Sequence, residues 1–151
     1  MAKPVCHIVG AGECDVLHLT PGTEDLVIAA DAGYARLQQA GIRPNLVIGD
    51  FDSLGNVPDA DHVITLPAVK DITDTWAAVE QGRQRGYTSF ALYGCTGGRF
   101  DHTIANVQTA ANLAGCGMEC KIIDGGRVIT AIADGMELTF DETYHGFISV
   151  F

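Results

Sequence analysis

Residues 89–124 read SFALYGCTGGRFDHTIANVQTAANLAGCGMECKIID, and the fold class follows from their pattern. The first six residues are mostly apolar, which is typical of a buried strand, and residues 120–124 repeat this signal. Residues 102–114 between them show helical spacing of apolar side chains. We expect one buried face on this helix, made of Ile104, Val107, Ala111 and Ala114.

The same alternation extends toward the N-terminus. Four more strands are predicted at residues 5–12, 26–30, 45–49 and 62–66, and two more helices at residues 33–40 and 73–85. Gly41 and Pro44 predict the end of the first of these helices, and Thr73 or Asp71 can cap the second. Apolar strands that alternate with helices predict an α/β fold: a mainly parallel, Rossmann-like sheet with helices on both faces.

The pattern changes after residue 125. RVITAIADGMELTFD (127–141) and HGFISVF (145–151) resemble hairpin strands, with no helix between them. They predict either an edge of the sheet or the beginning of a second, β-rich unit.

Composition restricts the class of protein. With 151 residues, 47% hydrophobic and 19% charged, the chain has the content of one globular domain. No apolar run approaches the roughly 20 residues of a membrane helix, and the N-terminus lacks signal-peptide features, so we expect a cytoplasmic protein. The five cysteines form no CxxC pair, which favours reduced thiols. The net charge of −10 comes without a cluster of basic residues, so nucleic-acid binding is not expected.

Four short segments concentrate the chemistry: ADAG (30–33), GDFDS (49–53), KDITD (70–74) and GCTGGRFDH (94–102). Each follows a predicted strand, directly or after a few residues. In an open parallel sheet, ligands bind beyond the carboxyl ends of the strands. We therefore expect six aspartates along one edge: Asp31, Asp50, Asp52, Asp71, Asp74 and Asp101.

Two pairs of these aspartates predict a metal site. Asp50 and Asp52 point to the same side of an extended chain, and Asp71 and Asp74 share a face at a helix start. Such carboxylates repel one another unless a cation lies between them. Mg²⁺ is the natural candidate, because it prefers oxygen ligands and shares them with substrate phosphates. For any single residue the alternative is an ordinary turn or helix cap, where aspartate is common.

The glycine-rich segment predicts a phosphate site. Gly94, Gly97 and Gly98 allow close approach of the backbone, and the helix that begins near Asp101 attracts phosphate with its N-terminus. Arg99 has the fork geometry that suits phosphate oxygens. Lys70 is a further candidate for phosphate binding, although a lone surface lysine is the simpler interpretation. His102 is a candidate for a polar contact in the site, although a histidine beside a helix cap is more often structural.

Two familiar nucleotide motifs are excluded. GAGECD (10–15) lacks the third glycine of the dinucleotide fingerprint, and GCTGGRF lacks the Lys-Ser/Thr ending of a Walker A loop. Neither dinucleotide redox chemistry nor a standard P-loop ATPase is therefore expected.

GDFDS, KDITD and GCTGGRFDHTIANV, in this order and at these spacings, closely resemble the signature segments of thiamine pyrophosphokinases. ADAG resembles the family's ADGG, with Ala32 where glycine is usual. The resemblance spans about residues 5–150. It implies a Mg²⁺-dependent enzyme that transfers diphosphate from ATP to the hydroxyl of thiamine and releases thiamine diphosphate and AMP.

The resemblance also implies roles for individual residues. The magnesium and diphosphate cluster would be Asp50, Asp52, Asp71 and Asp74, with Arg99 as a further catalytic residue. The nucleotide-binding residues would be Asp31, Lys70, Gly94, Thr96, Gly97, Gly98, Arg99, Asp101 and His102.

The family's architecture implies a division of the chain. Residues 1–125 would form the ATP-binding catalytic α/β domain, and residues 126–151 the edge strands that open a truncated C-terminal β-sandwich. Family members are homodimers with active sites between subunits. The second domain contributes to the thiamine site, and the resemblance implies that this chain lacks nearly all of that domain. We therefore expect the chain to bind nucleotide but to transfer diphosphate to thiamine poorly or not at all.

Three other functions compete with this interpretation. A related diphosphokinase could act on another alcohol, such as a pterin. A nucleotide-binding module without activity has no need for so many adjacent acids. A metal-dependent phosphohydrolase would also use clustered aspartates, but it leaves the GGRFDH segment without a role.

Overall fold

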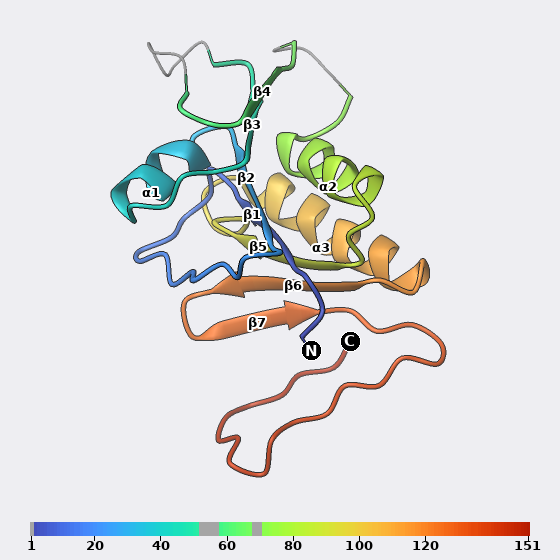
Figure 1. Cartoon of the computed structure of the whole chain (residues 1–151). Helices are drawn as coiled ribbons and strands as arrows, with labels where there is room; N and C mark the ends of the chain where they lie inside the picture. The colour runs from blue at the N-terminus through green and yellow to red at the C-terminus, as the bar shows by residue number, and fades with distance from the viewer. Residues whose placement is uncertain (1, 52–57, 68–70) are drawn as a thin grey trace.

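The computed structural model describes residues 2–51, 58–67 and 71–151, which form a mixed α/β fold (Figure 1). The elements lie close to the predicted positions. They are β1 Cys6–Val9, β2 Leu26–Ala30, α1 Gly33–Gln39, β3 Leu46–Gly49, β4 His62–Thr65, α2 Asp74–Gln84, β5 Ser89–Tyr93, α3 Phe100–Gly115, β6 Glu119–Asp124 and β7 Arg127–Thr130. Among these described residues, none of the helices has both the length and the apolar character to span a bilayer.

The strands form one seven-stranded sheet in the order β4-β3-β2-β1-β5-β6-β7. All neighbours pair in parallel except β6 and β7, which are antiparallel. The chain builds outward from β1 to β4 on one side and then returns to place β5 on the other side of β1. The strand order therefore reverses between β1 and β5, and such a switch point is where open α/β sheets bind ligands.

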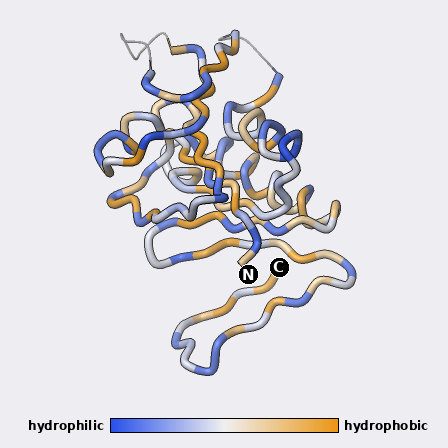
Figure 2. The backbone as a smooth tube through the Cα atoms, viewed as in Figure 1, coloured by the Kyte–Doolittle hydropathy of each residue, from blue (hydrophilic) through white to orange (hydrophobic). Residues whose placement is uncertain are grey.

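Alternate residues of the central strands face opposite layers. Ile8 and Ile28 pack toward α2 and α3, whereas Val9 and Val27 pack toward α1 and its Leu37. This arrangement confirms the prediction of helices on both faces (Figure 1). Figure 2 shows the hydrophobic residues running along the central strands, as expected for strands that are buried on both sides.

The predicted ends of two helices are confirmed. Gly41 follows α1 with φ of +69°, the left-handed conformation that ends many helices. Thr73 caps α2, because its Oγ1 accepts a hydrogen bond of 3.1 Å from the Trp76 N–H.

The predicted buried face of α3 is wrong. Ile104 and Val107 are 44% and 36% exposed, and Ala111 is also exposed, so only Ala114 of the expected face is buried. The buried residues of the helix are Asn106, Thr109, Ala110, Leu113 and Ala114. The two polar side chains among them can be buried because each donates a hydrogen bond to a backbone carbonyl. The spacing of apolar residues does not identify these two positions, because it takes no account of polar side chains.

The expected strands beyond β7 are not formed. β7 confirms an edge hairpin, but residues 131–151 contain no helix or strand. The segment extends as a long loop beyond β7 (Figure 1), and side chains such as Phe147 and Phe151 are fully exposed. Strands need hydrogen-bonded neighbours, and within the described residues this segment pairs with none.

A polar cluster fixes the chain between β1 and β2. The Asp25 carboxylate accepts hydrogen bonds of 2.8 Å from the Val5 and Gly22 N–H groups, and it lies 3.1 Å from His7 Nε2. The other ring nitrogen of His7 lies 3.3 Å from the Tyr93 hydroxyl. Burial alone would raise the pKa of Asp25, but the hydrogen bonds outweigh it, and the pKa is lowered.

Asp25→Asn should lower the free energy of unfolding by ~1–3 kcal/mol at neutral pH, because the N–H groups of Val5 and Gly22 lose a charged acceptor. A lowered native pKa means that the carboxylate stabilises the fold above the ordinary pKa of 3.8. This stabilisation disappears as the pH falls through the native pKa. Urea unfolding should therefore show a smaller difference in the free energy of unfolding between Asp25→Asn and wild type at acidic pH. Glu24→Gln is the control, because Glu24 is the exposed residue next to Asp25 in the sequence. Its free energy of unfolding should stay within ~0.5 kcal/mol of wild type.

Candidate functional site

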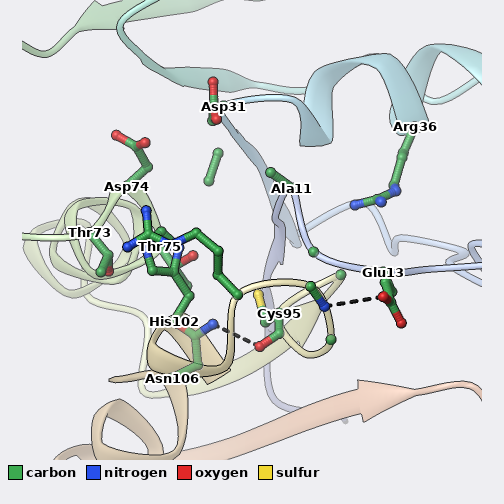
Figure 3. Close-up of a pocket in the computed structure, with 16 residues that line it drawn as sticks. Ala11, Glu13, Asp31, Arg36, Thr73, Asp74, Thr75, Cys95, His102 and Asn106 are labelled. Atoms are coloured by element: carbon green, nitrogen blue, oxygen red, sulfur yellow. Dashed lines mark hydrogen bonds between the residues drawn. The ribbon is translucent and has the colours of Figure 1, made fainter. Parts of the chain in front are cut away.

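A pocket of about 410 Å³ lies at the carboxyl ends of β1, β2 and β5, at the switch point of the sheet. The first turns of α2 and α3 complete its wall. Figure 3 shows Asp74 and Thr75 on the α2 side, with Glu13 and Arg36 on the opposite side. Parallel strands and their following helices thus bring together side chains that are far apart in the sequence.

Two loops are joined at the base of this pocket. The Gly12 N–H donates to the Gly94 carbonyl at 2.7 Å, and the Glu13 N–H donates to the Thr96 carbonyl at 2.9 Å. The Glu13 carboxylate in turn accepts a hydrogen bond of 3.2 Å from the Gly98 N–H. The loop after β1 and the glycine-rich turn after β5 therefore form one surface.

The glycine-rich turn has the conformation that the sequence predicts. Gly94, Gly97 and Gly98 have φ of +59°, +71° and +60°, which other residues adopt rarely. All three line the pocket. Thr96 is buried beneath the turn and does not line the pocket, so its connection to the site runs through its backbone.

Helix N-termini supply a positive potential at the pocket. α3 begins at Phe100, one residue after the turn, and α2 begins at Asp74 behind its Thr73 cap. The free N–H groups of a first helical turn attract anions, phosphate above all. Two such ends beside a glycine-rich turn suit a phosphorylated ligand.

The structure separates the predicted aspartates into two groups. Asp31 and Asp74 line the pocket, whereas Asp50, Asp71 and Asp101 do not. Asp52 lies outside the described residues. Asp50 directly follows β3, at the same edge of the sheet as Asp31, which follows β2.

Asp31 has an unusual backbone. Its φ of +53° is left-handed, and its N–H donates to the Ile48 carbonyl of β3 at 2.7 Å. Non-glycine residues in this conformation cluster at functional sites. The turn holds the carboxylate at the pocket instead of continuing the strand.

The magnesium prediction remains a prediction. In residues 2–51, 58–67 and 71–151, no three His, Cys, Asp or Glu side chains are placed to hold a metal ion. One predicted ligand, Asp52, is not among these residues. The donor chemistry does fit, because Mg²⁺ in nucleotide sites commonly uses one or two carboxylates and takes its other ligands from water and phosphates. Asp31 and Asp74 provide two carboxylates at the pocket.

Arg99 and His102, two of the residues predicted to bind nucleotide, line the pocket. The Arg99 Nε donates to the Asp101 carboxylate at 3.2 Å. This hydrogen bond lowers the pKa of the Asp101 carboxyl group. Asp101 does not line the pocket itself, but it holds the Arg99 guanidinium in place there. Lys70, the other predicted cation, lies outside the described residues.

The pocket is also lined by residues that were not predicted from the sequence, among them Glu13, Arg36, Thr75, Cys95 and Asn106. The place of GAGE directly after a central strand was a signal for Glu13, because that position puts it at the carboxyl edge. Burial raises the pKa of the Cys95 thiol to about 12, so this cysteine stays protonated and is no nucleophile. No sequence pattern around Arg36 predicted that its side chain would reach the pocket.

Comparison with known proteins identifies relatives. Residues 18–122 match the family model for the catalytic domain of thiamin pyrophosphokinase. Thiamine pyrophosphokinase of Bacillus subtilis is 30% identical over 127 residues, covering 78% of this chain and 59% of the relative.

Solved structures agree with this match. The crystal structure of the Bacillus subtilis thiamine pyrophosphokinase superposes with a TM-score of 0.69 at 28% identity, covering 80% of this chain and 61% of the other. That of the Geobacillus thermodenitrificans thiamin pyrophosphokinase gives 0.67 at 32% identity, with 80% and 59% coverage. The chain thus spans about three fifths of the length of these relatives.

Proposed function

This chain belongs to the thiamin pyrophosphokinase catalytic-domain family, and on that basis we propose that it transfers diphosphate from ATP to thiamine. The products are thiamine diphosphate and AMP. The observation that carries the proposal is the pocket at the β1–β5 switch point. It combines a glycine-rich turn, two helix N-termini and two carboxylates, Asp31 and Asp74.

In the proposed reaction, the hydroxyl oxygen of thiamine attacks the β-phosphorus of ATP. The bond from that phosphorus to the bridging oxygen of the α-phosphate breaks, and AMP leaves. Such a transfer is accelerated mainly by positioning and by stabilising charge on the phosphates. The glycine-rich turn at residues 94–98 and the N-terminus of α3 hold the phosphates, and Arg99 offsets their charge at the rim.

The magnesium site is part of the proposal. Asp50, Asp52, Asp71 and Asp74 would hold the ion, which when bound neutralises phosphate charge. Asp74 is favoured as a ligand by its position in the pocket lining, and Asp50 by its place at the same edge of the sheet. One of the carboxylates takes the proton of the hydroxyl group as the oxygen attacks.

We also propose the division into two domains, the cytoplasmic location and the homodimer expected from the sequence. Support for a boundary near residue 125 comes from residues 131–151, which contain no helix or strand and expose large apolar side chains. On this proposal, ATP binding depends on residues 1–125, and thiamine binding depends mainly on the second domain.

The identity of the nucleotide product tests the reaction. Incubation with ATP, thiamine and Mg²⁺ should yield AMP and thiamine diphosphate in equal amounts, with little ADP. ATP binding should be measured separately by calorimetry, so that weak transfer is distinguished from failure to bind nucleotide. ADP or inorganic phosphate as the main product would contradict diphosphate transfer and favour a phosphohydrolase. A pterin alcohol in place of thiamine tests the specificity for the acceptor.

A further inference from the structure

Arg36 brings a second guanidinium to the pocket. It lies on α1, is half-buried, and lines the wall opposite Asp74 (Figure 3). Its Nη1 donates a hydrogen bond of 2.6 Å to the Gly10 carbonyl, directly after β1. This bond fixes the guanidinium at the switch point, because Gly10 directly follows β1 at the carboxyl end of the β1–β5 pair.

The guanidinium also packs against the glycine-rich turn. A side chain added at Gly94 would place its Cβ 2.7 Å from the Arg36 Nη1 and equally close to the Gly10 carbonyl. The absence of a side chain at Gly94 therefore leaves room for the arginine. The positive charge consequently lies beside the first residue of the turn that we propose binds phosphate.

The two arginines of the pocket differ in how their charge is balanced. Arg99 is held by the Asp101 carboxylate, and its side chain is 69% exposed. Arg36 donates to a neutral carbonyl, and in the described part of the chain no carboxylate forms an ion pair with it. A guanidinium has five N–H donors, so the bond to Gly10 leaves most of them for a ligand. A half-buried cation of this kind favours an anionic ligand oxygen.

We infer that Arg36 is a phosphate-binding residue, which contacts a phosphate of the nucleotide held on the turn at residues 94–98. This inference rests on the proposed function, since it deepens the ATP site of that proposal. The hydrogen bond to Gly10 gives the side chain its position, and the remaining N–H groups meet the phosphate oxygens. Arg36 thereby links α1 to a site otherwise built from the ends of β1, β5 and α3.

The test compares nucleotides that differ in charge, using calorimetry on the 151-residue chain. Arg36→Met should weaken ATP binding by ~10-fold to 100-fold, because hydrogen bonds to charged groups contribute this much. Its affinity for adenosine, which carries no phosphate, should stay within ~2-fold of wild type. Arg36→Lys should recover part of the ATP affinity, since it keeps the charge but loses the fork. Arg43→Met is the matched control, because Arg43 pairs with Asp59 and Asp61 away from the pocket.

Equal losses for ATP and adenosine would mean that Arg36 only holds Gly10 in place, and the inference would be wrong. Unchanged ATP affinity in Arg36→Met would overturn it as well. If Arg36→Met does not fold, the selective loss of ATP over adenosine in Arg36→Lys decides the question. If wild type binds neither ATP nor adenosine, the proposed function fails. The inference is then tested with inorganic tripolyphosphate, whose binding Arg36→Met must weaken.

Discussion

Gly33→Ala should destabilise the fold by at least ~3 kcal/mol, a large part of the 5–15 kcal/mol that ordinarily separates folded from unfolded protein. Gly33 is the first residue of α1, and a Cβ added there would lie 1.8 Å from the Val9 carbonyl oxygen of β1. The Val9 oxygen is a backbone atom and the new Cβ would be bonded directly to the backbone of α1, so the clash cannot be relieved without separating α1 from the sheet. Urea unfolding followed by circular dichroism measures the loss.

Gly115→Ala is the matched control. Gly115 is the last residue of α3, and a Cβ there would meet no atom within 4 Å. Alanine is the better helix former by up to ~1 kcal/mol, so this variant should be as stable as wild type or slightly more stable. A Gly33→Ala protein within ~1 kcal/mol of wild type would show that α1 does not approach β1 as closely as described.

This geometry explains the departure from the family's ADGG segment. Ala32 has φ of −64° and is exposed, so a side chain is accommodated without strain. The requirement for glycine applies to position 33, where the chain keeps it. The fold therefore accommodates the alanine at position 32, and the absence of a side chain at Gly33 lets α1 approach the sheet closely.

Asp74→Asn should give the largest loss of function. Asp74 lines the pocket from the first turn of α2, and asparagine keeps its size while removing the charge that would hold Mg²⁺. We expect AMP formation to fall by ~100-fold or more, the usual effect of removing a group that stabilises charge in a transition state. ATP binding should lose most of its dependence on Mg²⁺. The fold should lose only the ~0.3–1 kcal/mol that an acidic residue contributes at a helix N-terminus.

Glu80→Gln is the control for this variant. Glu80 lies on the same helix, undergoes the same change of charge, and pairs with Arg83 instead of lining the pocket. Its AMP formation and its response to Mg²⁺ should match those of wild type. If Asp74→Asn kept the wild-type response to Mg²⁺ in ATP binding, Asp74 would have to be removed from the magnesium site.

Local signals explain which features could be predicted from the sequence. The parallel strands were predicted because most of their residues are apolar, and Gly41 and Thr73 marked helix ends through their own local chemistry. Asp31 and Asp74 were found because strand ends of a parallel sheet share an edge. The missed features depend on distant partners.

Two residues illustrate such partners. Asn106 is buried because it donates to the Cys95 carbonyl, and Arg36 reaches the pocket because it donates to the Gly10 carbonyl. These partners lie 11 and 26 positions away in the sequence. Periodicity records the burial of apolar groups, and it carries no information on which polar groups find acceptors elsewhere in the fold.

The joined loops of the pocket have a consequence for how the protein folds. The hydrogen bond between Glu13 and Gly98 connects residues 85 positions apart, and β5 must pair with β1 before it can form. Contacts between such distant residues form late, since a long loop must close first. During synthesis, the N-terminal strands leave the ribosome well before residues 94–98 exist to complete the turn. A nucleotide that binds this turn, as we propose, would therefore stabilise the finished domain and give no help to its early intermediates.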